Sequence, residues 1–264
     1  MLIKKKNEFR KGYNQITSED EKDNNMMMDF GIIILEKNDV YANDEKKERA
    51  FLLMSGDVTF EFDDVSYSVR RNSLLDELPY TLHVSKNTKV KLTSTGKCEI
   101  CYIATKNDND FKSVFYKPEN TRSEQRGKGT MKETSTRIVR TIFDKSNAPY
   151  ANLVLGEVVN YPGKWSSYPP HHHPQPEIYH YRIFPKHGFG ISILGDEAYK
   201  VCDGDTVKIL NDKVHPQVSA PGYAMYYIWA IRHFKDNPYI TPVFVKEHMW
   251  VMEENASIWP EEEK

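Results

Sequence analysis

Short apolar runs, separated by turn residues, recur along most of the chain. The runs are rich in β-branched and aromatic residues, and glycine or aspartate marks many of the turns, as at Gly56 and Asp63-Asp64. They cover residues 30–35, 51–62, 65–69, 81–84, 90–93, 151–159, 177–184, 188–194, 199–203, 206–210 and 223–231. Short strands about 8–12 residues apart are typical of a β-sandwich or barrel. No long stretch repeats its apolar residues every ~3.6 positions, as a helix would, so the pattern predicts an all-β fold.

The distribution of these runs divides the chain into four segments. Residues 1–28 form an N-terminal arm, and residues 29–105 form a first strand-rich half. Residues 106–150 are rich in Lys, Arg, Asn, Asp, Ser and Thr, which indicates a solvated connector, although residues 137–142 could add a strand. Residues 151–264 form a second strand-rich half that ends in an acidic tail.

Charge and composition exclude several classes of partner. The 264 residues carry 36 Lys and Arg against 38 Asp and Glu, a net charge of −2, so no basic excess favours nucleic acid or an anionic membrane surface. No apolar stretch of signal-peptide quality follows the first lysines, and no run approaches the ~18 apolar residues of a membrane span. Cys98 and Cys101 have redox or zinc spacing, but they lie within a predicted strand, which favours buried thiols. We therefore expect a cytoplasmic protein.

Histidines are concentrated in the second half. Eight of the nine lie between positions 171 and 248, and three of them are consecutive. On a strand, side chains two positions apart face the same side, so His171 and His173 are neighbours and His172 faces away. If the later His215 lies on a strand beside them, three imidazoles and the Glu177 carboxylate converge on one divalent ion with open coordination positions. The alternative is an exposed histidine tract with adventitious metal affinity.

The same residues resemble a known motif. His171-x-His173, three further residues and Glu177, followed by Gly204-Asp205 and His215, are similar to the two-part signature of the cupins. The Gly-Asp element alone is weakly specific.

The neighbouring segments narrow the resemblance. Residues 163–171, which include the string Trp-Ser-Ser-Tyr-Pro-Pro-His, resemble the 5-deoxy-glucuronate isomerase family of bacterial myo-inositol catabolism. Further similar segments are 126–129, 177–182, 215–216, 220–223 and 226–227, so the resemblance covers most of the chain. Two features depart from the family pattern: the loop between His173 and Glu177 is shorter, and His172 stands where lysine is usual.

The resemblance implies a bicupin, that is, two β-sandwich or jelly-roll barrels with the metal site in the C-terminal barrel. The N-terminal barrel, whose only histidine is His83, would serve structure or assembly. The implied reaction is an aldose–ketose isomerisation of 5-deoxy-D-glucuronate to 5-dehydro-2-deoxy-D-gluconate, through an enediol or enediolate. The implied cofactor is one divalent ion (Zn, Mn or Fe) that polarises the substrate's oxygens, and a general base must move the proton.

The alternation of side chains between the two faces of a strand, here called strand parity, identifies candidates for the general base. Tyr179 and Tyr181 share the face of Glu177, and Tyr227 shares a face with Trp229 on the last strand. Each tyrosine could instead only pack or form hydrogen bonds.

The substrate's carboxylate requires a cation. Lys164, Arg182 and Arg232 are the candidates, although parity places Arg182 opposite Glu177 unless the strand is bulged. Ser167 shares the inward face with the ligand histidines and is a further candidate for substrate binding.

Three other functions fit the same ligands. They are a related uronate ketol-isomerase of pectin degradation, an Fe(II) cupin dioxygenase and a non-catalytic sugar-binding cupin. In each case the partner is a small molecule such as a sugar acid, and a homo-oligomer is left open.

Overall fold

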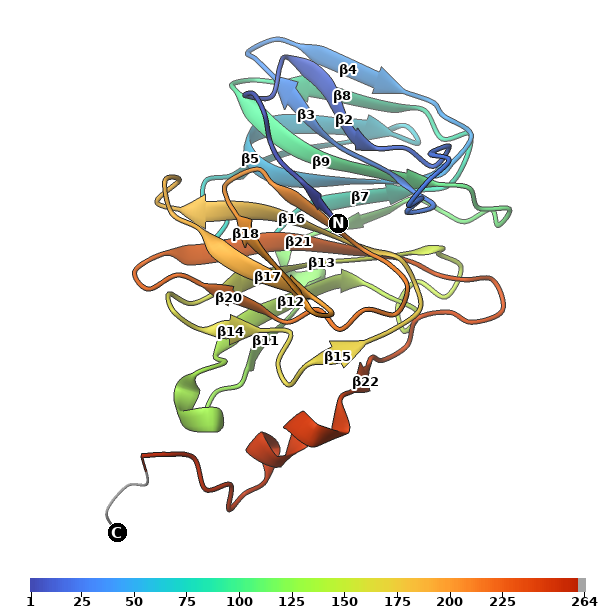
Figure 1. Cartoon of the computed structure of the whole chain (residues 1–264). Coiled ribbons are helices and arrows are strands. Elements are labelled where there is room, and N and C mark those ends of the chain that lie inside the picture. The colour runs from blue at the N-terminus through green and yellow to red at the C-terminus, as the bar shows by residue number, and fades with distance from the viewer. Residues whose placement is uncertain (261–264) are drawn as a thin grey trace.

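Strands dominate the architecture. The computed structural model describes residues 1–260, and its helices in that range are three short 3₁₀ helices at Pro118–Asn120, Met131–Glu133 and Lys246–Met252. Two β-rolls lie one above the other, the N-terminal roll in blue and green and the C-terminal roll in yellow to red (Figure 1). The expected all-β fold with two barrels is confirmed. No helix in the described range could span a membrane.

The first roll is a nine-stranded sheet that folds over itself. Its strands are β2 (Gly12–Thr17), β3 (Asp29–Leu35), β4 (Val40–Asn43), β5 (Glu48–Phe62), β6 (Val65–Arg71), β7 (Thr81–Val84), β8 (Val90–Ser94), β9 (Cys98–Thr105) and β10 (Val114–Tyr116). The main path runs β10-β7-β5-β9-β3-β2. The long β5 belongs to both layers, because its first part pairs with β7 and β9 and its last part with β6 and β8.

The second roll combines a seven-stranded, a four-stranded and a two-stranded sheet. The large sheet has the order β1 (Leu2–Ile3), β19 (Thr206–Ile209), β16 (Glu177–Phe184), β21 (Ala224–Arg232), β13 (Leu153–Asn160), β12 (Arg137–Phe143) and β11 (Arg122–Arg126). The second sheet has the order β14 (Trp165–Ser166), β20 (Gln217–Ser219), β17 (Gly190–Leu194) and β18 (Glu197–Val201). Within the described part of the chain, β15 (His171–His172) forms a two-stranded sheet with β22 (Val243–Phe244).

The apolar side chains form three clusters: one inside each roll and one between the rolls. This arrangement explains why the run at 30–35 is apolar without alternation. Ile33 and Leu35 point into the first roll, whereas Ile32 and Ile34 pack in the cluster between the rolls. β16 is divided in the same way, since Tyr179, Tyr181 and Ile183 line the second roll and Ile178 packs between the rolls. The inward face of β16 is therefore the face that carries the candidate chemistry.

The first roll has an apolar interior. Its packed side chains include Phe51, Phe60, Leu82, Leu92 and Tyr102, and the described residues form no group of metal-ligating side chains there. Cys98 packs inside this roll and Cys101 between the rolls, so the two thiols are buried on opposite faces of β9 and are not a pair.

His83, the histidine of the first half, has contacts that indicate a structural role. Its Nε2 lies 2.9 Å from Glu48 Oε1, and both side chains are fully buried. Its ring stacks on Phe143 at 4.2 Å between centroids. Glu48 also accepts a hydrogen bond of 2.7 Å from the backbone N–H of Asn152, so this polar pair ties the first roll to the second.

Two segments contribute more strands than the sequence pattern indicated. Within the expected arm at 1–28, β1 pairs with β19 of the second roll and β2 pairs with β3 of the first. Within the expected connector at 106–150, β10 joins the first roll, and β11 and β12 extend the large sheet of the second. The polar composition of this connector concealed the strands, because several of its cations bind partners elsewhere in the fold.

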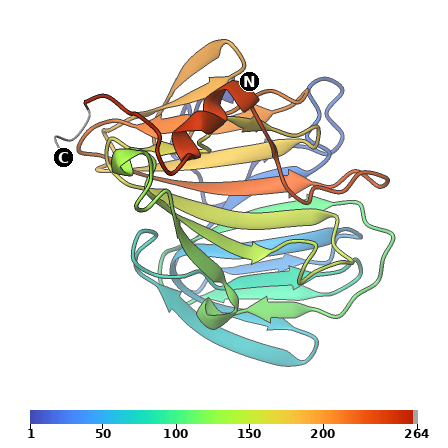
Figure 2. The same cartoon turned by 90° about the horizontal axis from the view of Figure 1, so that it is seen from below.

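The C-terminal segment crosses the outer side of the second roll. After β21 the chain returns along the roll and forms β22 beside β15. The 3₁₀ helix Lys246–Met252 then lies beyond the roll, on the side away from the first roll (Figure 1), and Figure 2 shows it in front of the strands of the second roll. The segment between β21 and β22 forms one wall of the candidate site.

Candidate metal centre

Three separate segments of the second roll bring the candidate ligands together. His171 lies on β15, His173 follows it, and Glu177 opens β16. His215 lies two residues before β20, and its backbone N–H donates to the carbonyl of His171 at 3.3 Å. The segment of His215 is therefore held against that of His171 by this hydrogen bond, although His215 does not lie on a strand as the sequence analysis had assumed.

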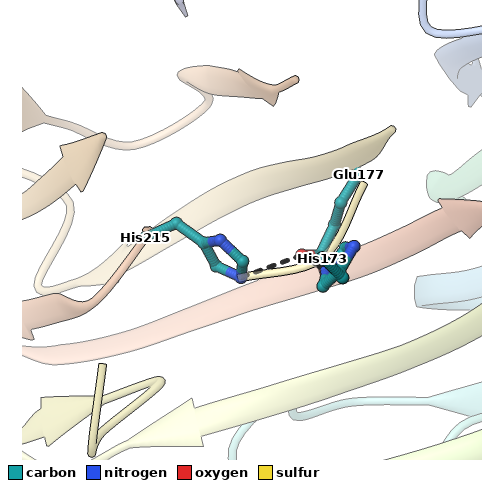
Figure 3. Close-up of side chains that lie close together, drawn as sticks. All are labelled: His173, Glu177 and His215. Carbon is teal, nitrogen blue, oxygen red and sulfur yellow. Dashed lines mark hydrogen bonds and ion pairs between the residues drawn. The ribbon is translucent and has the colours of Figure 1, made fainter. Parts of the chain in front are cut away.

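The imidazoles of His173 and His215 converge on the carboxylate of Glu177 (Figure 3). Glu177 Oε2 lies 3.1 Å from His173 Nε2 and 3.3 Å from His215 Nε2. The ligand atoms of the three residues all lie within 4.8 Å of one another, and all three residues are buried. This spacing suits a single ion with bonds of about 2.0–2.2 Å to each ligand.

His171 stands beside this group. Its ring meets that of His215 edge-on, with centroids 4.9 Å apart. His171 also lines the cavity that His173 and Glu177 line, which is described below. His172 points elsewhere, with its Nδ1 2.6 Å from the half-exposed Asp212 carboxylate. The alternation along β15 thus separates His172 from the other candidate ligands.

Backbone carbonyls fix which nitrogen of each ring is available. A carbonyl can only accept, so each Nδ1 must carry the proton and donate it. These bonds join His171 to Pro169 at 3.3 Å, His173 to Gln175 at 3.1 Å and His215 to Lys213 at 2.8 Å. The Nε2 lone pairs are left free, and a second hydrogen bond of this kind is a usual partner of metal-bound imidazole.

The electrostatics of the group fit a bound cation. Burial lowers the pKa of His171 to about 2 and also lowers the pKa of His215, so both rings are neutral at pH 7, the form that binds metal. The buried Nε2 of His215 has no hydrogen-bond partner among the described residues. Lone pairs of two imidazoles then face a carboxylate oxygen, and a cation among them would turn that repulsion into attraction.

The candidate ligands open into a cavity of about 360 Å³. Tyr179, Tyr227 and Trp229 form one wall, and strands β11 and β12 contribute a second wall. Residues 239–242 of the C-terminal segment form a third. A cavity of this size accommodates a small sugar derivative.

Two of the three candidate tyrosines face the cavity. The hydroxyl of Tyr179 lies 3.2 Å from Ser167 Oγ, and that of Tyr227 lies 2.6 Å from Ser166 Oγ. Burial raises the pKa of both tyrosines, so both are protonated at neutral pH. Tyr181 does not line the cavity, and its hydroxyl donates to Gln217 Oε1.

The three cations expected at the substrate lie elsewhere. Arg182 forms an ion pair with Glu99 of the first roll, which is the outcome that strand parity favoured. Arg232 donates to Thr105 Oγ1 at 2.6 Å, and Lys164 does not line the cavity. The placement of these residues argues against a role in binding the substrate, whereas Ser167 does line the cavity.

The cavity instead contains three arginines that sequence reasoning missed. Arg122, Arg126 and Arg137 lie on β11 and β12 and line the cavity. The sequence feature that could have located them is the alternation of polar and apolar residues at 137–142, which already suggested a strand. Recognising that this strand borders the site required knowledge of its pairing with β13.

The wall at 239–242 was also missed. The ring of Tyr239 meets that of His173 at 4.7 Å between centroids, and Gln175 Nε2 donates to the Asn237 carbonyl at 2.8 Å. The backbone N–H of Val245 donates to the Pro170 carbonyl at 2.9 Å. No periodic pattern in the sequence of this segment indicates that it closes the site.

Asp205, the second residue of the Gly-Asp element, lies away from the site. Its carboxylate accepts hydrogen bonds from Lys4 Nζ at 2.8 Å and from the backbone N–H groups of Lys5 and Cys202 at 2.9 and 2.8 Å. It therefore anchors the N-terminal strand to the second roll.

Comparisons with known proteins agree with this architecture. 5-deoxy-glucuronate isomerase of Geobacillus thermodenitrificans is 28% identical over 196 residues, which cover 66% of each chain. The protein of the same name from Geobacillus kaustophilus is 26% identical over 245 residues, or 85% of each chain. The crystal structure of an IolB-like protein from Salmonella typhimurium LT2 superposes with a TM-score of 0.84 at 21% identity, covering 96% of this chain and 99% of that one. Since the model of the KduI/IolB family matches residues 1–251, the chain belongs to the KduI/IolB family.

Proposed function

We propose that this protein is a metal-dependent aldose–ketose isomerase that converts 5-deoxy-D-glucuronate to 5-dehydro-2-deoxy-D-gluconate. The relatives named 5-deoxy-glucuronate isomerase support the reaction and the substrate. The observation that carries the proposal is the convergence of His173 Nε2 and His215 Nε2 on one oxygen of Glu177 within the cavity.

The proposed metal ligands are His171, His173, Glu177 and His215. One divalent ion held by them would supply positive charge that polarises a carbonyl and an adjacent hydroxyl. Zinc, manganese and iron all suit this mixture of imidazole and carboxylate ligands.

The two cavity tyrosines have different proposed roles. Isomerisation removes a proton from one carbon of the substrate and returns a proton to its neighbour. The ring of Tyr179 lies 5.9 Å from that of His215, so a cation held by the ligands would favour the Tyr179 phenolate. That phenolate would accept the proton from the first carbon and, as the phenol, return it to the second, which makes Tyr179 our candidate for the general base. Tyr227, held by Ser166, is placed to donate a hydrogen bond to a substrate oxygen.

The C-terminal wall covers one side of the site. Residues 239–242 line the cavity, and the pairing of β22 with β15 holds them beside the ligand strand. A sheltered site strengthens every charge interaction within it and limits side reactions of the intermediate.

Incubation of the metal-loaded protein with 5-deoxy-D-glucuronate in deuterated water tests the proposal. We expect a ketose product that carries deuterium on carbon, detected by NMR and mass spectrometry, and we expect chelation to abolish turnover. Oxygen consumption without a ketose would indicate a dioxygenase instead, and tight binding without turnover would indicate a sugar-binding protein. A homo-oligomeric state and a cytoplasmic location stay predictions.

A further inference from the structure

One cavity arginine is buried without an anionic partner. Arg137 of β12 is only 7% exposed, and no carboxylate in residues 1–260 forms an ion pair with it. Its guanidinium donates from Nη1 to the carbonyl and hydroxyl oxygens of Ser135, at 2.8 and 2.9 Å, and from Nη2 to the carbonyl of Tyr168 at 3.2 Å. All these acceptors are neutral, so no negative charge within residues 1–260 balances the positive charge of Arg137.

The other two cavity arginines differ from Arg137. Arg126 Nε lies 2.8 Å from Glu124 Oε2, and Arg122 forms an ion pair with Asp144. Both arginine side chains are about half exposed, at 54% and 45%. Their charges are therefore already paired and solvated, which leaves Arg137 as the cavity arginine with unmet charge.

The free donors of Arg137 have the geometry that a carboxylate needs. A guanidinium has five N–H groups, and the three hydrogen bonds above leave two, namely Nε–H and one N–H of Nη2. Nε and Nη2 lie on the same edge of the guanidinium, so they can bind both oxygens of one carboxylate side by side. A buried arginine is costly unless a charged partner binds it, and this requirement favours an anionic ligand.

Arg137 also lies close to the reacting groups. It lines the same cavity as His171, Tyr179 and Tyr227. Its Nη2 donates to the carbonyl of Tyr168, which lies three positions before His171 in the same segment. A small molecule that spans the cavity could therefore reach Arg137 at one end and the proposed metal-binding residues at the other.

We propose that Arg137 binds the carboxylate of the substrate through a bidentate ion pair and thereby selects sugar acids over neutral sugars. This inference rests on the proposed isomerase function and identifies the substrate class that its site accepts. Arg137 is assigned to substrate binding, and the proton transfer is left to the tyrosines.

The test compares 5-deoxy-D-glucuronate with 5-deoxy-D-glucose, in which a hydroxymethyl group replaces the carboxylate. We expect the wild-type protein to prefer the acid by about 100-fold in kcat/KM, as is typical for a buried charge-assisted pair. Arg137→Gln should lose about 100-fold with the acid, mainly through KM, and should leave the neutral sugar nearly unaffected. Arg137→Lys keeps the charge without the planar fork and should lose about 10-fold. Arg70→Gln, which removes an exposed charge that pairs with Asp57 in the first roll and does not line the cavity, is the control and should change kcat/KM by less than about 3-fold.

Binding of D-glucarate, a sugar acid without an aldehyde, separates this inference from the proposed function. Calorimetry should detect wild-type binding and its loss in Arg137→Gln, whether or not the protein is an isomerase. If the wild-type protein isomerises both sugars equally well, or Arg137→Gln keeps the preference for the acid, the assignment of Arg137 is wrong while the isomerase proposal stands. If glucarate binds through Arg137 but no ketose forms, the isomerase proposal fails and the carboxylate site remains. Unchanged metal content in each variant shows that the ligand group is intact.

Discussion

Arg71 of the first roll and Glu157 of the second form a fully buried ion pair between the rolls. Nη2 and Nη1 of Arg71 lie 2.6 and 3.0 Å from the two carboxylate oxygens of Glu157, and both side chains are 0% exposed. Arg140 Nη1 donates to the same carboxylate at 3.0 Å, and the Tyr226 hydroxyl donates to it at 2.7 Å. Because Arg71 ends β6 of the first roll and Glu157 lies on β13 of the second, this network links the two rolls at their junction.

Removal of Arg71 should destabilise the protein strongly. We expect Arg71→Met to lower the free energy of unfolding by about 3 kcal/mol, because Glu157 would keep its buried charge and lose a bidentate partner. Urea denaturation measures the effect. The neighbouring Arg70 is 65% exposed and pairs with Asp57, so Arg70→Met should be far milder. Equal losses in the two variants would contradict the assigned role of the buried pair.

A buried histidine outside the site should make stability depend on pH. His180 donates or accepts a hydrogen bond with Thr206 Oγ1 at 2.8 Å, and burial followed by the charge of Lys5 lowers its pKa to about 3. Between that value and the ordinary pKa near 6.5, the unfolded chain binds a proton at this position and the folded chain does not. Stability is therefore fully present above about pH 6.5 and falls as the pH drops through this window.

Chelator-treated protein unfolded at several pH values between 7.5 and 4.5 tests this expectation. Near pH 5, His180→Gln should reduce the slope of unfolding free energy against pH by about 1.4 kcal/mol per pH unit, the equivalent of one proton. The exposed His187 provides the control, since His187→Gln should leave the slope unchanged. A slope that is the same in wild type and His180→Gln would show that His180 is not held neutral.

The sequence predicted those parts of the site that local alternation determines. The facing of His171 and His173, the opposite facing of His172 and the shared facing of Tyr227 and Trp229 all follow from strand parity. The apolar runs likewise located the long central strands of both rolls, such as β5, β13, β16 and β21. These features depend on neighbours along the chain, and a pattern of period two reports them directly.

Features that depend on distant partners were not predictable in this way. Arg140 and Arg137 looked like solvated connector charges, yet both are buried, and Arg140 is paired with Glu157, which is 17 positions away and lies on another strand. The wall at 239–242 is positioned by the short pairing of β22 with β15, which has no signature in composition. Long cations such as Arg182 could be assigned to the site or to the junction of the rolls only once the face of β16 was known.

The tyrosine assignments predict a difference in activity among three conservative variants. Tyr179→Phe should lower kcat by about 100-fold or more, the usual cost of losing a proton-transfer group. Tyr227→Phe should lower kcat by about 100-fold, the usual cost of losing a hydrogen-bond donor to an oxygen that gains charge in the transition state. Tyr181→Phe should lower activity much less, because its hydroxyl donates to Gln217 outside the cavity. Its effect should instead be a loss of about 1–3 kcal/mol of stability, since the buried acceptor of Gln217 would be left unsatisfied. Steady-state kinetics and thermal unfolding of the same samples separate the two outcomes.

The candidate ligands predict metal-dependent stability. A ligand that binds only the folded state raises the free energy of unfolding, by about 2.7 kcal/mol at 100 times its Kd. We expect added zinc or manganese to raise the unfolding temperature of the wild type, and we expect no such shift in His215→Ala.

His172→Ala is a matched control, because His172 is adjacent to a ligand but its ring contacts Asp212. The control should retain both the shift and the metal content measured by mass spectrometry after dialysis. Circular dichroism should show that His215→Ala is folded, because within residues 1–260 the His215 side chain forms no hydrogen bond beyond the one from its Nδ1 to the Lys213 carbonyl. Full metal retention by folded His215→Ala would remove this residue from the ligand set and, with it, the geometric basis of the proposed centre.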